Sequence, residues 1–238
     1  MIESSSNKFV KYLTKLNDKK YQDLEGKFLA FGVHLVSEAK KSGYLEKAIL
    51  LEENKEYENA ILVSENIMKK ITGLKTPPKA LGLCNKIKPK EINGNVAILD
   101  NIQDPGNLGT IMRSAKAFNI DTILINKGSV NPYNPKVVSA SEGMIFHQNF
   151  IICDIKEKIK NLKKNGYKIY TTDVSGGTEL EKIDFDKKTC IILGNEGNGV
   201  SKDISLLSDE TINIKLNSLC ESLNVAVCAS IIFYKLNI

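Results

Sequence analysis

Asparagine, glycine and serine gather in three stretches of this 238-residue chain, each where an apolar run meets a loop or an expected helix. The stretches are residues 96–115 (VAILDNIQDPGNLGTIMRSA), 191–201 (IILGNEGNGVS) and 216–229 (LNSLCESLNVAVCA). Glycine allows close approach to the main chain, and asparagine tolerates left-handed backbone conformations better than most residues. Such loops hold a ligand mostly through main-chain groups, and junctions at one edge of an α/β sheet are where these folds bind ligands. We therefore expect the three stretches to form one site.

Four side chains in these stretches carry candidate chemistry. Arg113 is the only arginine among 33 basic residues and lies six residues after Asn107. This indicates a need for planar guanidinium geometry, with chance as the alternative. Glu196 either is a surface carboxylate or orders Arg113 or the loops by a charge-assisted hydrogen bond. Ser222 and Asn224 either bind a ligand or cap the last helix, since both residue types favour helix N-termini.

The sequence patterns of several common enzyme classes are missing. The glycines of residues 194–199 fall as G-x-x-G-x-G, without the Lys-Ser/Thr of a phosphate loop, which argues against a dehydrogenase or an NTPase. His34 and His147 are the only histidines and have no second ligand at metal spacing, so neither a His-based metal site nor a Ser-His-Asp hydrolase is indicated. The five cysteines form no C-x-x-C pair, so we expect free, mostly buried thiols and no metal.

The net charge of +5 lies entirely in the first part of the chain. Residues 1–92 contain 17 lysines and 12 acidic residues, whereas residues 93–238 contain 16 basic and 16 acidic residues. A basic first part suits a phosphate backbone, and a solvated lysine-rich surface is the alternative. No apolar run is long enough to span a membrane and the N-terminus lacks a secretory segment, so we expect a cytoplasmic protein.

The apolar periodicity predicts two α/β parts. The first alternates short strands and helices up to about residue 85, and residues 86–95 (KIKPKEINGN) are the linker candidate. Its expected elements are helices at 7–16 (capped by Ser4 to Ser6), 33–42 and 65–72, and strands at 28–31, 48–51, 60–63 and 80–84.

The second part reads as the β-α-β series of a doubly wound parallel sheet. Residues 96–100 (VAILD) resemble a strand buried on both faces. The other expected elements are helices at 108–119, 154–165 and from about 222, strands at 121–125, 145–152, 167–172, 191–193 and 211–214, and a loop at 131–135.

Taken together and in order, the motifs NIQDPGNLGTIMRSA, LGNEGNGVS and ESLNVAVCAS resemble those of the SpoU/TrmH family of SPOUT RNA ribose 2′-O-methyltransferases. NKFVKYLTKL and KFLAFGVHLVSEAKKSG resemble that family's substrate-binding domain, a small α/β fold shared with RNA-binding ribosomal proteins. The resemblance implies an RNA-binding domain at 1–90 and a methyltransferase domain with a deep trefoil knot at 91–238. It also implies a homodimer formed through the knotted domain, with both protomers shaping the site.

The resemblance assigns roles to residues. Asn107, Arg113, Glu196, Ser222 and Asn224 match the catalytic positions of the three motifs. S-adenosylmethionine would be the methyl donor and would lie, mostly against main-chain groups, beside Leu193, Gly194, Asn195, Gly199, Ile214, Leu216 and Leu223.

The reaction requires a ribose 2′-hydroxyl to attack the sulfonium methyl in line. The family account gives the hydroxyl proton to the arginine, although a guanidinium is protonated at neutral pH. Arg113 is therefore either a perturbed base or a group that fixes the target phosphate and ribose while the proton leaves to phosphate or water.

Four positions depart from the family pattern. Lys215 stands where proline is usual before the third motif, Ser139 where arginine is frequent, Phe31 where glutamate is usual, and Gln22 in place of an N-terminal arginine. We expect 2′-O-methylation of structured RNA, with ribosomal RNA favoured by the separate N-terminal domain. The alternatives are a transfer-RNA methyltransferase and a non-catalytic RNA-binding protein that assists ribosome assembly.

Overall fold

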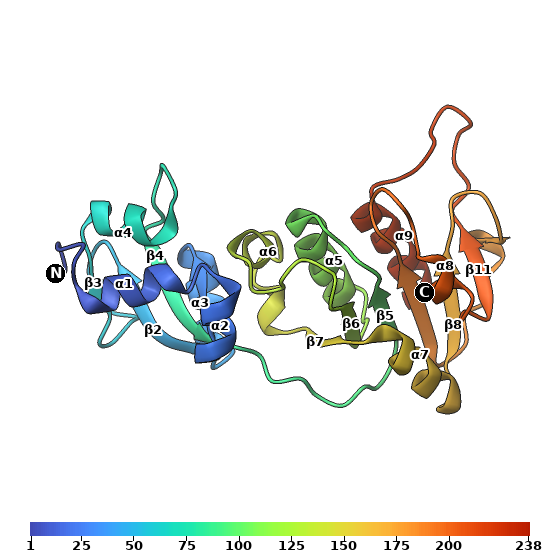
Figure 1. Cartoon of the computed structure of the whole chain (residues 1–238), viewed down its shortest axis with the longest axis horizontal. Helices are drawn as coiled ribbons and strands as arrows, with labels where there is room; N and C mark the ends of the chain where they lie inside the picture. The colour runs from blue at the N-terminus through green and yellow to red at the C-terminus, as the bar shows by residue number, and fades with distance from the viewer. The chain divides into compact units, whose positions relative to one another are not determined.

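The computed structural model describes residues 1–238 and contains two compact units. The first unit consists of Met1–Lys88 and Asn131–His147, and the second of Pro89–Val130 and Gln148–Ile238. Figure 1 identifies the elements of each unit. The sequence placed residues 131–147 in the second domain, whereas in the structure they pack with the first unit.

The first unit is built on a four-stranded sheet of order β1-β4-β2-β3. The central strand β4 is antiparallel to β1 and β2, and β3 is parallel to β2. Leu13, Met68 and Ile49 belong to a core between one sheet face and helices α1 and α4, while Val36 of α3 packs with Ala48 on the other face. The bounds are α1 Lys8–Lys15, α2 Lys19–Glu25, β1 Lys27–Phe31, α3 Val33–Lys41, β2 Leu45–Leu50, β3 Ile61–Leu62, α4 Glu65–Thr72 and β4 Ala80–Asn85.

Two features at the start of the first unit differ from expectation. Asn7, not a serine of residues 4–6, caps α1, because its side-chain oxygen accepts the amide of Phe9 at 2.8 Å. Helix α2 was not predicted, since it is only seven residues long. It is capped by Asp18 and ends at Gly26, whose φ of 64° requires a left-handed conformation.

The segment Asn131–His147 packs on the first unit through aromatic and polar contacts. It contains α6 (Pro135–Ala140) and a 3₁₀ turn, η1 (Met144–Phe146). The rings of Tyr133 and Phe146 lie 4.8 and 5.9 Å from that of Phe28. Buried Gln22 donates to the carbonyl oxygen of Tyr133 at 3.2 Å and accepts from Asn131 at 2.7 Å. Gln22, which stands in place of the arginine of the family pattern, thus holds this segment to the first unit.

The second unit is a seven-stranded sheet in which all neighbouring strands are parallel, with order β7-β6-β5-β10-β8-β11-β9. The strands are β5 Val96–Leu99, β6 Thr122–Asn126, β7 Asn149–Cys153, β8 Lys168–Thr172, β9 Thr178–Glu179, β10 Thr189–Leu193 and β11 Glu210–Asn213. The expected strand at 145–152 was placed too early, because its first residues form η1. The α/β fold class with a parallel sheet is confirmed.

Helices cover both faces of this sheet, as expected for a doubly wound fold. Helices α7 (Ile155–Lys164) and α8 (Lys202–Ser205) pack through Ile159 and Ile204 on the face that carries Ile98 and Ile192. Neighbouring residues in these strands point to the opposite face. There, α5 (Pro105–Ala117) and α9 (Val225–Asn237) lie side by side, with Ser114 and Ser230 hydrogen-bonded at 2.7 Å. None of these helices combines the length and the hydropathy of a membrane-spanning segment.

Candidate functional site

The candidate site lies at the carboxyl ends of β5 and β10, adjacent strands at the centre of the sheet. The chain continues from β5 to β6 on one side, while β8 flanks β10 on the other, so this is a topological switch point. Asp100, only 1% exposed, follows β5 and accepts the hydroxyl of Ser201 at 2.6 Å and its amide at 2.9 Å. The loops after the two strands are thereby tied together.

The loop after β10 is a tight turn that requires glycine at its start. A Cβ on Gly194 would lie 2.1 Å from the carbonyl carbon of Gly199, so main chain meets main chain there. Asn195 and Gly199 exchange two main-chain hydrogen bonds of 2.9 Å. The side chain of Asn195 accepts the amides of Gly197 and Asn198 and donates to the carbonyl oxygen of Asn101 at 2.8 Å. The turn is therefore rigid and anchored to the β5 loop.

Glu196 receives three hydrogen bonds from the start of α5. Its carboxylate accepts Asn107 Nδ2 at 3.0 Å and the amides of Asp104 and Gln103 at 3.0 and 3.1 Å. Partial burial raises the pKa of Glu196, but these hydrogen bonds outweigh burial and the net effect is a lowered pKa. Of the two interpretations of Glu196, the ordering of loops applies, with Asn107 rather than Arg113 as its partner.

Asn224 joins the third stretch to this cluster. Its Nδ2 donates to Asn107 Oδ1 at 2.9 Å, and its Oδ1 accepts the amides of Ala226 and Val227 at 2.9 and 3.3 Å. Asn224 is therefore both the N-cap of α9 and a link to α5. Glu196, Asn107 and Asn224 form one hydrogen-bonded chain that draws on all three stretches.

Arg113 and Ser222 lie outside this hydrogen-bonded chain. Arg113 is exposed on α5 and makes no hydrogen bond or ion pair. It is six residues from Asn107, which corresponds to about 9 Å along the helix and a different face. Ser222 is also exposed, and its carbonyl oxygen accepts the thiol of Cys220 at 3.3 Å. The structure of a single chain thus assembles three of the five predicted catalytic residues.

The residues predicted to hold the cofactor follow the carboxyl ends of β10 and β11. Leu193 is fully buried, while Ile214, Leu216 and Leu223 are half-buried and offer apolar side chains. The amides of Lys215 and Leu216 donate no hydrogen bond within the chain. Half-buried apolar side chains beside unused main-chain donors fit a nucleoside ligand. The structure contains no group of three or more His, Cys, Asp or Glu side chains placed to hold a metal ion.

Two further residues support the site but were not singled out in the sequence. Asp100 and Ser201 lock the β5 and β10 loops, and the signal for the first was a carboxylate directly after a fully buried apolar run. Lys215, the departure nearest the site, is 74% exposed and lies 3.8 Å from Glu179. Its ammonium group therefore points to solvent.

Comparison with known proteins agrees with this architecture. The SpoU rRNA Methylase family profile matches residues 94–234, and the MRM3-like substrate binding domain matches residues 7–82. The chain is 33% identical over 243 residues to the 23S rRNA (guanosine(2553)-2′-O)-methyltransferase RlmP of Bacillus subtilis, covering 99% of this chain and 98% of that protein.

Solved structures with the same fold cover nearly the whole chain. A TrmH-family protein from Porphyromonas gingivalis is 26% identical, with a TM-score of 0.86 over 99% of this chain and 98% of that one. The AdoMet-bound rRNA methyltransferase of Sinorhizobium meliloti is 24% identical, with a TM-score of 0.86 over 98% of this chain and 95% of that one. At this level of identity the likeness concerns the fold only. On the combined sequence match, this chain belongs to the SpoU rRNA methylase family.

Proposed function

We propose that this protein is an S-adenosylmethionine-dependent methyltransferase that modifies a ribose 2′-hydroxyl in ribosomal RNA. The observation that carries the proposal is the hydrogen-bonded chain Glu196–Asn107–Asn224, which unites the three family motifs at a switch point of the sheet. Membership of the SpoU family and the similarity to a 23S rRNA 2′-O-methyltransferase support it.

The residues of the chain divide the work between binding and positioning. The turn 194–199 and the residues around Ile214, Leu216 and Leu223 hold the cofactor, mainly through main-chain groups. Bound S-adenosylmethionine supplies an electrophilic sulfonium methyl group. Glu196 and Asn107 fix the first turn of α5, so that the helix presents a constant surface to the RNA.

Arg113 acts as the RNA-positioning cation in this proposal. A guanidinium provides several donors in one plane, which suits a phosphate and the ribose beside it. Because a guanidinium is protonated at neutral pH, the proton of the 2′-hydroxyl leaves to phosphate or water. In this proposal Arg113 serves Ser222 and the cofactor loops of a second copy, because it forms no hydrogen bond to the Glu196–Asn107–Asn224 chain of its own copy.

An apolar surface on α9 supports a homodimer. Val227, Ile231, Tyr234 and Ile238 are 48%, 38%, 55% and 80% exposed and recur at helical spacing on one side of α9. Exposed apolar residues at this spacing are typical of a protein–protein interface. Arg113 is exposed on α5, the helix that packs beside α9, and in this proposal a dimer through the α9 surface brings Arg113 to the partner. The trefoil knot is part of the same proposal.

The first unit supplies the RNA contacts, in line with its match to a substrate-binding domain and the excess of lysine in residues 1–92. A ribosomal RNA substrate also agrees with the cytoplasmic location expected from the sequence.

Purified protein, S-adenosylmethionine and ribosomal RNA from a strain that lacks the gene provide the test. We expect methyl transfer to one ribose, detected as a block to alkaline cleavage, and the same 2′-O-methyl mark missing in RNA from the deletion strain. Methylation of transfer RNA alone would contradict the proposal that ribosomal RNA is the substrate. Tight RNA binding by folded protein without S-adenosylmethionine binding in calorimetry would overturn the enzyme and favour an assembly protein.

A further inference from the structure

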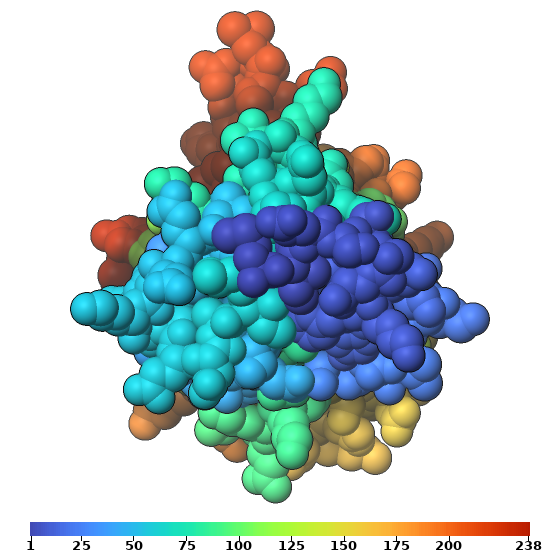
Figure 2. Space-filling model, turned by 90° about the vertical axis from the view of Figure 1, so that its left-hand side faces the viewer, coloured from blue at the N-terminus to red at the C-terminus, as the bar shows by residue number.

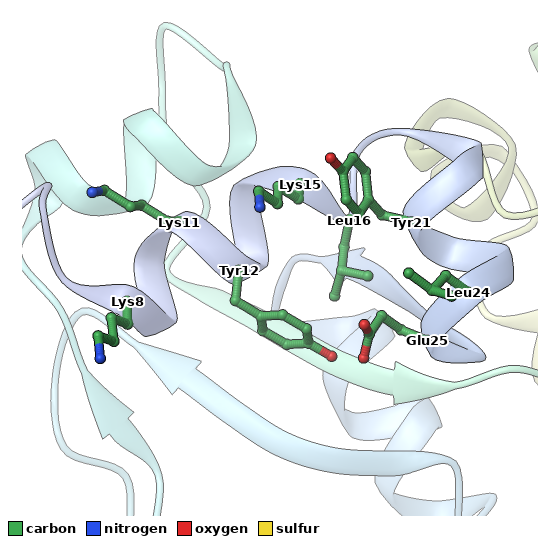
Figure 3. A pocket seen from close by; sticks show the side chains of 8 residues that line it. All are labelled: Lys8, Lys11, Tyr12, Lys15, Leu16, Tyr21, Leu24 and Glu25. Atoms are coloured by element: carbon green, nitrogen blue, oxygen red, sulfur yellow. The ribbon is translucent and has the colours of Figure 1, made fainter.

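A groove lies between α1 and α2 on the surface of the first unit, far along the chain from the motifs of the candidate site. It has a volume of about 450 Å³ and is lined by Lys8, Lys11, Tyr12, Lys15, Leu16, Tyr21, Leu24 and Glu25. Figure 2 shows α1, in dark blue, on the exposed surface of this unit. Figure 3 shows the side chains of the groove from close by.

The groove carries a row of unpaired cations. Lys8, Lys11 and Lys15 recur at positions i, i+3 and i+7 of α1, so they share one side of the helix. All three are exposed, and none forms an ion pair or a hydrogen bond through its ammonium group. Lys8 and Lys15 are about 10 Å apart along the axis, because an α-helix rises about 1.5 Å per residue. This spacing suits consecutive phosphates of one RNA strand.

Aromatic and apolar groups lie beside these cations. The Lys15 ammonium group lies 5.3 Å from the centre of the half-buried Tyr21 ring, so a cation and an aromatic ring lie together in the groove. Tyr12 also lines the groove, and Leu24 is 74% exposed. Every nucleobase has an aromatic face, and bases of single-stranded RNA stack on such rings. A duplex keeps its bases stacked on one another and has no use for this surface.

Glu25 adds an acceptor to the groove. Glu25 lines the groove on the side of the Tyr12 hydroxyl (Figure 3), and its exposed carboxylate forms no ion pair. A carboxylate opposes the binding of a plain polyanion or an acidic peptide, but it accepts N–H groups from the exocyclic amino group or imino nitrogen of a base. The mixture of three cations, two rings and one carboxylate therefore fits a nucleotide better than phosphate alone.

We propose that the groove between α1 and α2 binds an unpaired nucleotide segment of the RNA substrate. Its phosphates lie along Lys8, Lys11 and Lys15, and one base lies against Tyr21 with its N–H edge toward Glu25. This inference rests on the proposed function, because it specifies how the first unit recognises the RNA. It requires that the substrate contains a single-stranded segment.

Fluorescence anisotropy of the full-length protein with a short, labelled single-stranded RNA of mixed sequence tests the groove directly. The triple variant Lys8→Gln, Lys11→Gln, Lys15→Gln should bind more weakly and reduce the slope of log affinity against log salt by about two, since each phosphate contact contributes about 0.7. Tyr21→Leu should weaken binding roughly 10-fold, because a stacked base is lost, while Tyr21→Phe should restore it. The corresponding duplex should bind no more tightly than the single strand.

A second triple variant is the matched control. Lys160→Gln, Lys164→Gln and Lys187→Gln remove three exposed, unpaired lysines of the second unit, so the net charge changes equally. This control should retain the wild-type salt slope. Equal losses in the two triple variants, or identical binding by Tyr21→Leu and wild type, would overturn the proposal. Circular dichroism establishes whether each variant is folded. If the triple lysine variant does not fold, the comparison of Tyr21→Leu with Tyr21→Phe tests the groove instead.

The groove and the proposed reaction can fail separately. Oligonucleotide binding requires neither cofactor nor turnover. If the groove variants lose binding but the wild type methylates no RNA, the proposed binding groove stands and the proposed enzymatic function is wrong. If the groove variants methylate ribosomal RNA with an unchanged KM, the proposed enzymatic function stands and the proposed role of the groove is wrong. We expect a raised KM with little change in kcat or in S-adenosylmethionine affinity.

Discussion

Asn224 Nδ2 donates to Asn107 Oδ1 at 2.9 Å, so the first residue before α9 is bonded to the first turn of α5. The same Asn224 side chain caps α9 through the amides of Ala226 and Val227. One asparagine therefore has a structural role within its helix and a positioning role between two motifs. These two roles can be separated by substitution.

Asn224→Ala should lower stability, because the cap of α9 is lost. Loss of such a cap costs about 1 kcal/mol, which corresponds to a Tm decrease of roughly 2–4 °C in a protein of this size. Asn224→Ser should keep most of the Tm, since serine also caps helices, but it cannot reach Asn107 as an amide does. Thermal denaturation followed by circular dichroism measures both. Equal Tm values for the alanine variant and wild type would show that the cap contributes nothing.

Glu196→Gln should change how stability depends on pH. The folded-state pKa of Glu196 is lowered from its usual 4.5. Partial burial raises this pKa, but the hydrogen-bond donors of Asn107, Asp104 and Gln103 together lower it by more. A lowered pKa gives stability that is present above about pH 4.5 and lost as the pH falls through the folded pKa. The variant should therefore be less stable than wild type at pH 7, by at most about 1 kcal/mol, because this carboxylate is only partly shielded from solvent.

Urea unfolding across pH 3 to 7 measures this difference, which should shrink below about pH 4.5. Glu221→Gln is the matched control, because Glu221 is an exposed carboxylate that makes no hydrogen bond. A constant difference between Glu196→Gln and wild type over the whole range would contradict the assignment of the lowered pKa to the α5 donors.

Arg113→Lys should leave the fold intact and reduce methyl transfer by roughly 100-fold or more, since a lysine keeps the charge but loses the planar donors. Arg113 is exposed and makes no side-chain hydrogen bond or ion pair within its own chain, so Tm should be unchanged. Single-turnover methylation of ribosomal RNA is the measurement. Lys116→Ala, an exposed cation on the same helix, should retain wild-type turnover. Wild-type turnover by Arg113→Lys would remove Arg113 from the mechanism.

Most of the parallel sheet was predictable, because buried strands such as β5 are continuous apolar runs and their helices are long and periodic. Short elements were not predictable from their own sequence. Helix α2 has seven residues, and α6 follows a proline-rich loop whose conformation depends on tertiary contacts such as that between Tyr133 and Phe28. The assignment of residues 131–147 to the first unit is a long-range property that no local pattern encodes.

The site was predictable to the extent that residue types restrict it. Glycine and asparagine marked the loops, and their position at strand ends placed them on one edge of the sheet. The hydrogen-bond partners were not predictable, because the sequence pattern allowed Glu196 to pair with Arg113 as well as with other loop residues. The structure shows that its side-chain partner is Asn107. The buried pairing of Asp100 with Ser201 likewise follows only from the adjacency of β5 and β10.

Ile231→Asp should weaken the proposed homodimer, because it places a charge in the apolar surface of α9. Ile231 is 38% exposed in the single chain, so an aspartate there can reach solvent, whereas a dimer through this surface would enclose it. We expect a shift from dimer to monomer in sedimentation velocity and a parallel loss of methyl transfer. Val174→Asp, at a 67% exposed position in the β8–β9 loop, should remain dimeric. A monomeric wild type that methylates RNA would overturn the dimer.

Gly194→Ala should impair the cofactor turn, whereas Gly176→Ala should not. A Cβ at position 194 would lie 2.1 Å from the main chain of Gly199 and Val200, and neither can move without breaking the paired hydrogen bonds between Asn195 and Gly199. A Cβ at position 176 would meet no atom within 4 Å. Because the turn lies at a loop, Gly194→Ala should lose most S-adenosylmethionine affinity in calorimetry while the sheet still folds. If the alanine at 194 bound the cofactor as tightly as that at 176, the turn would not be where the methyl donor is held.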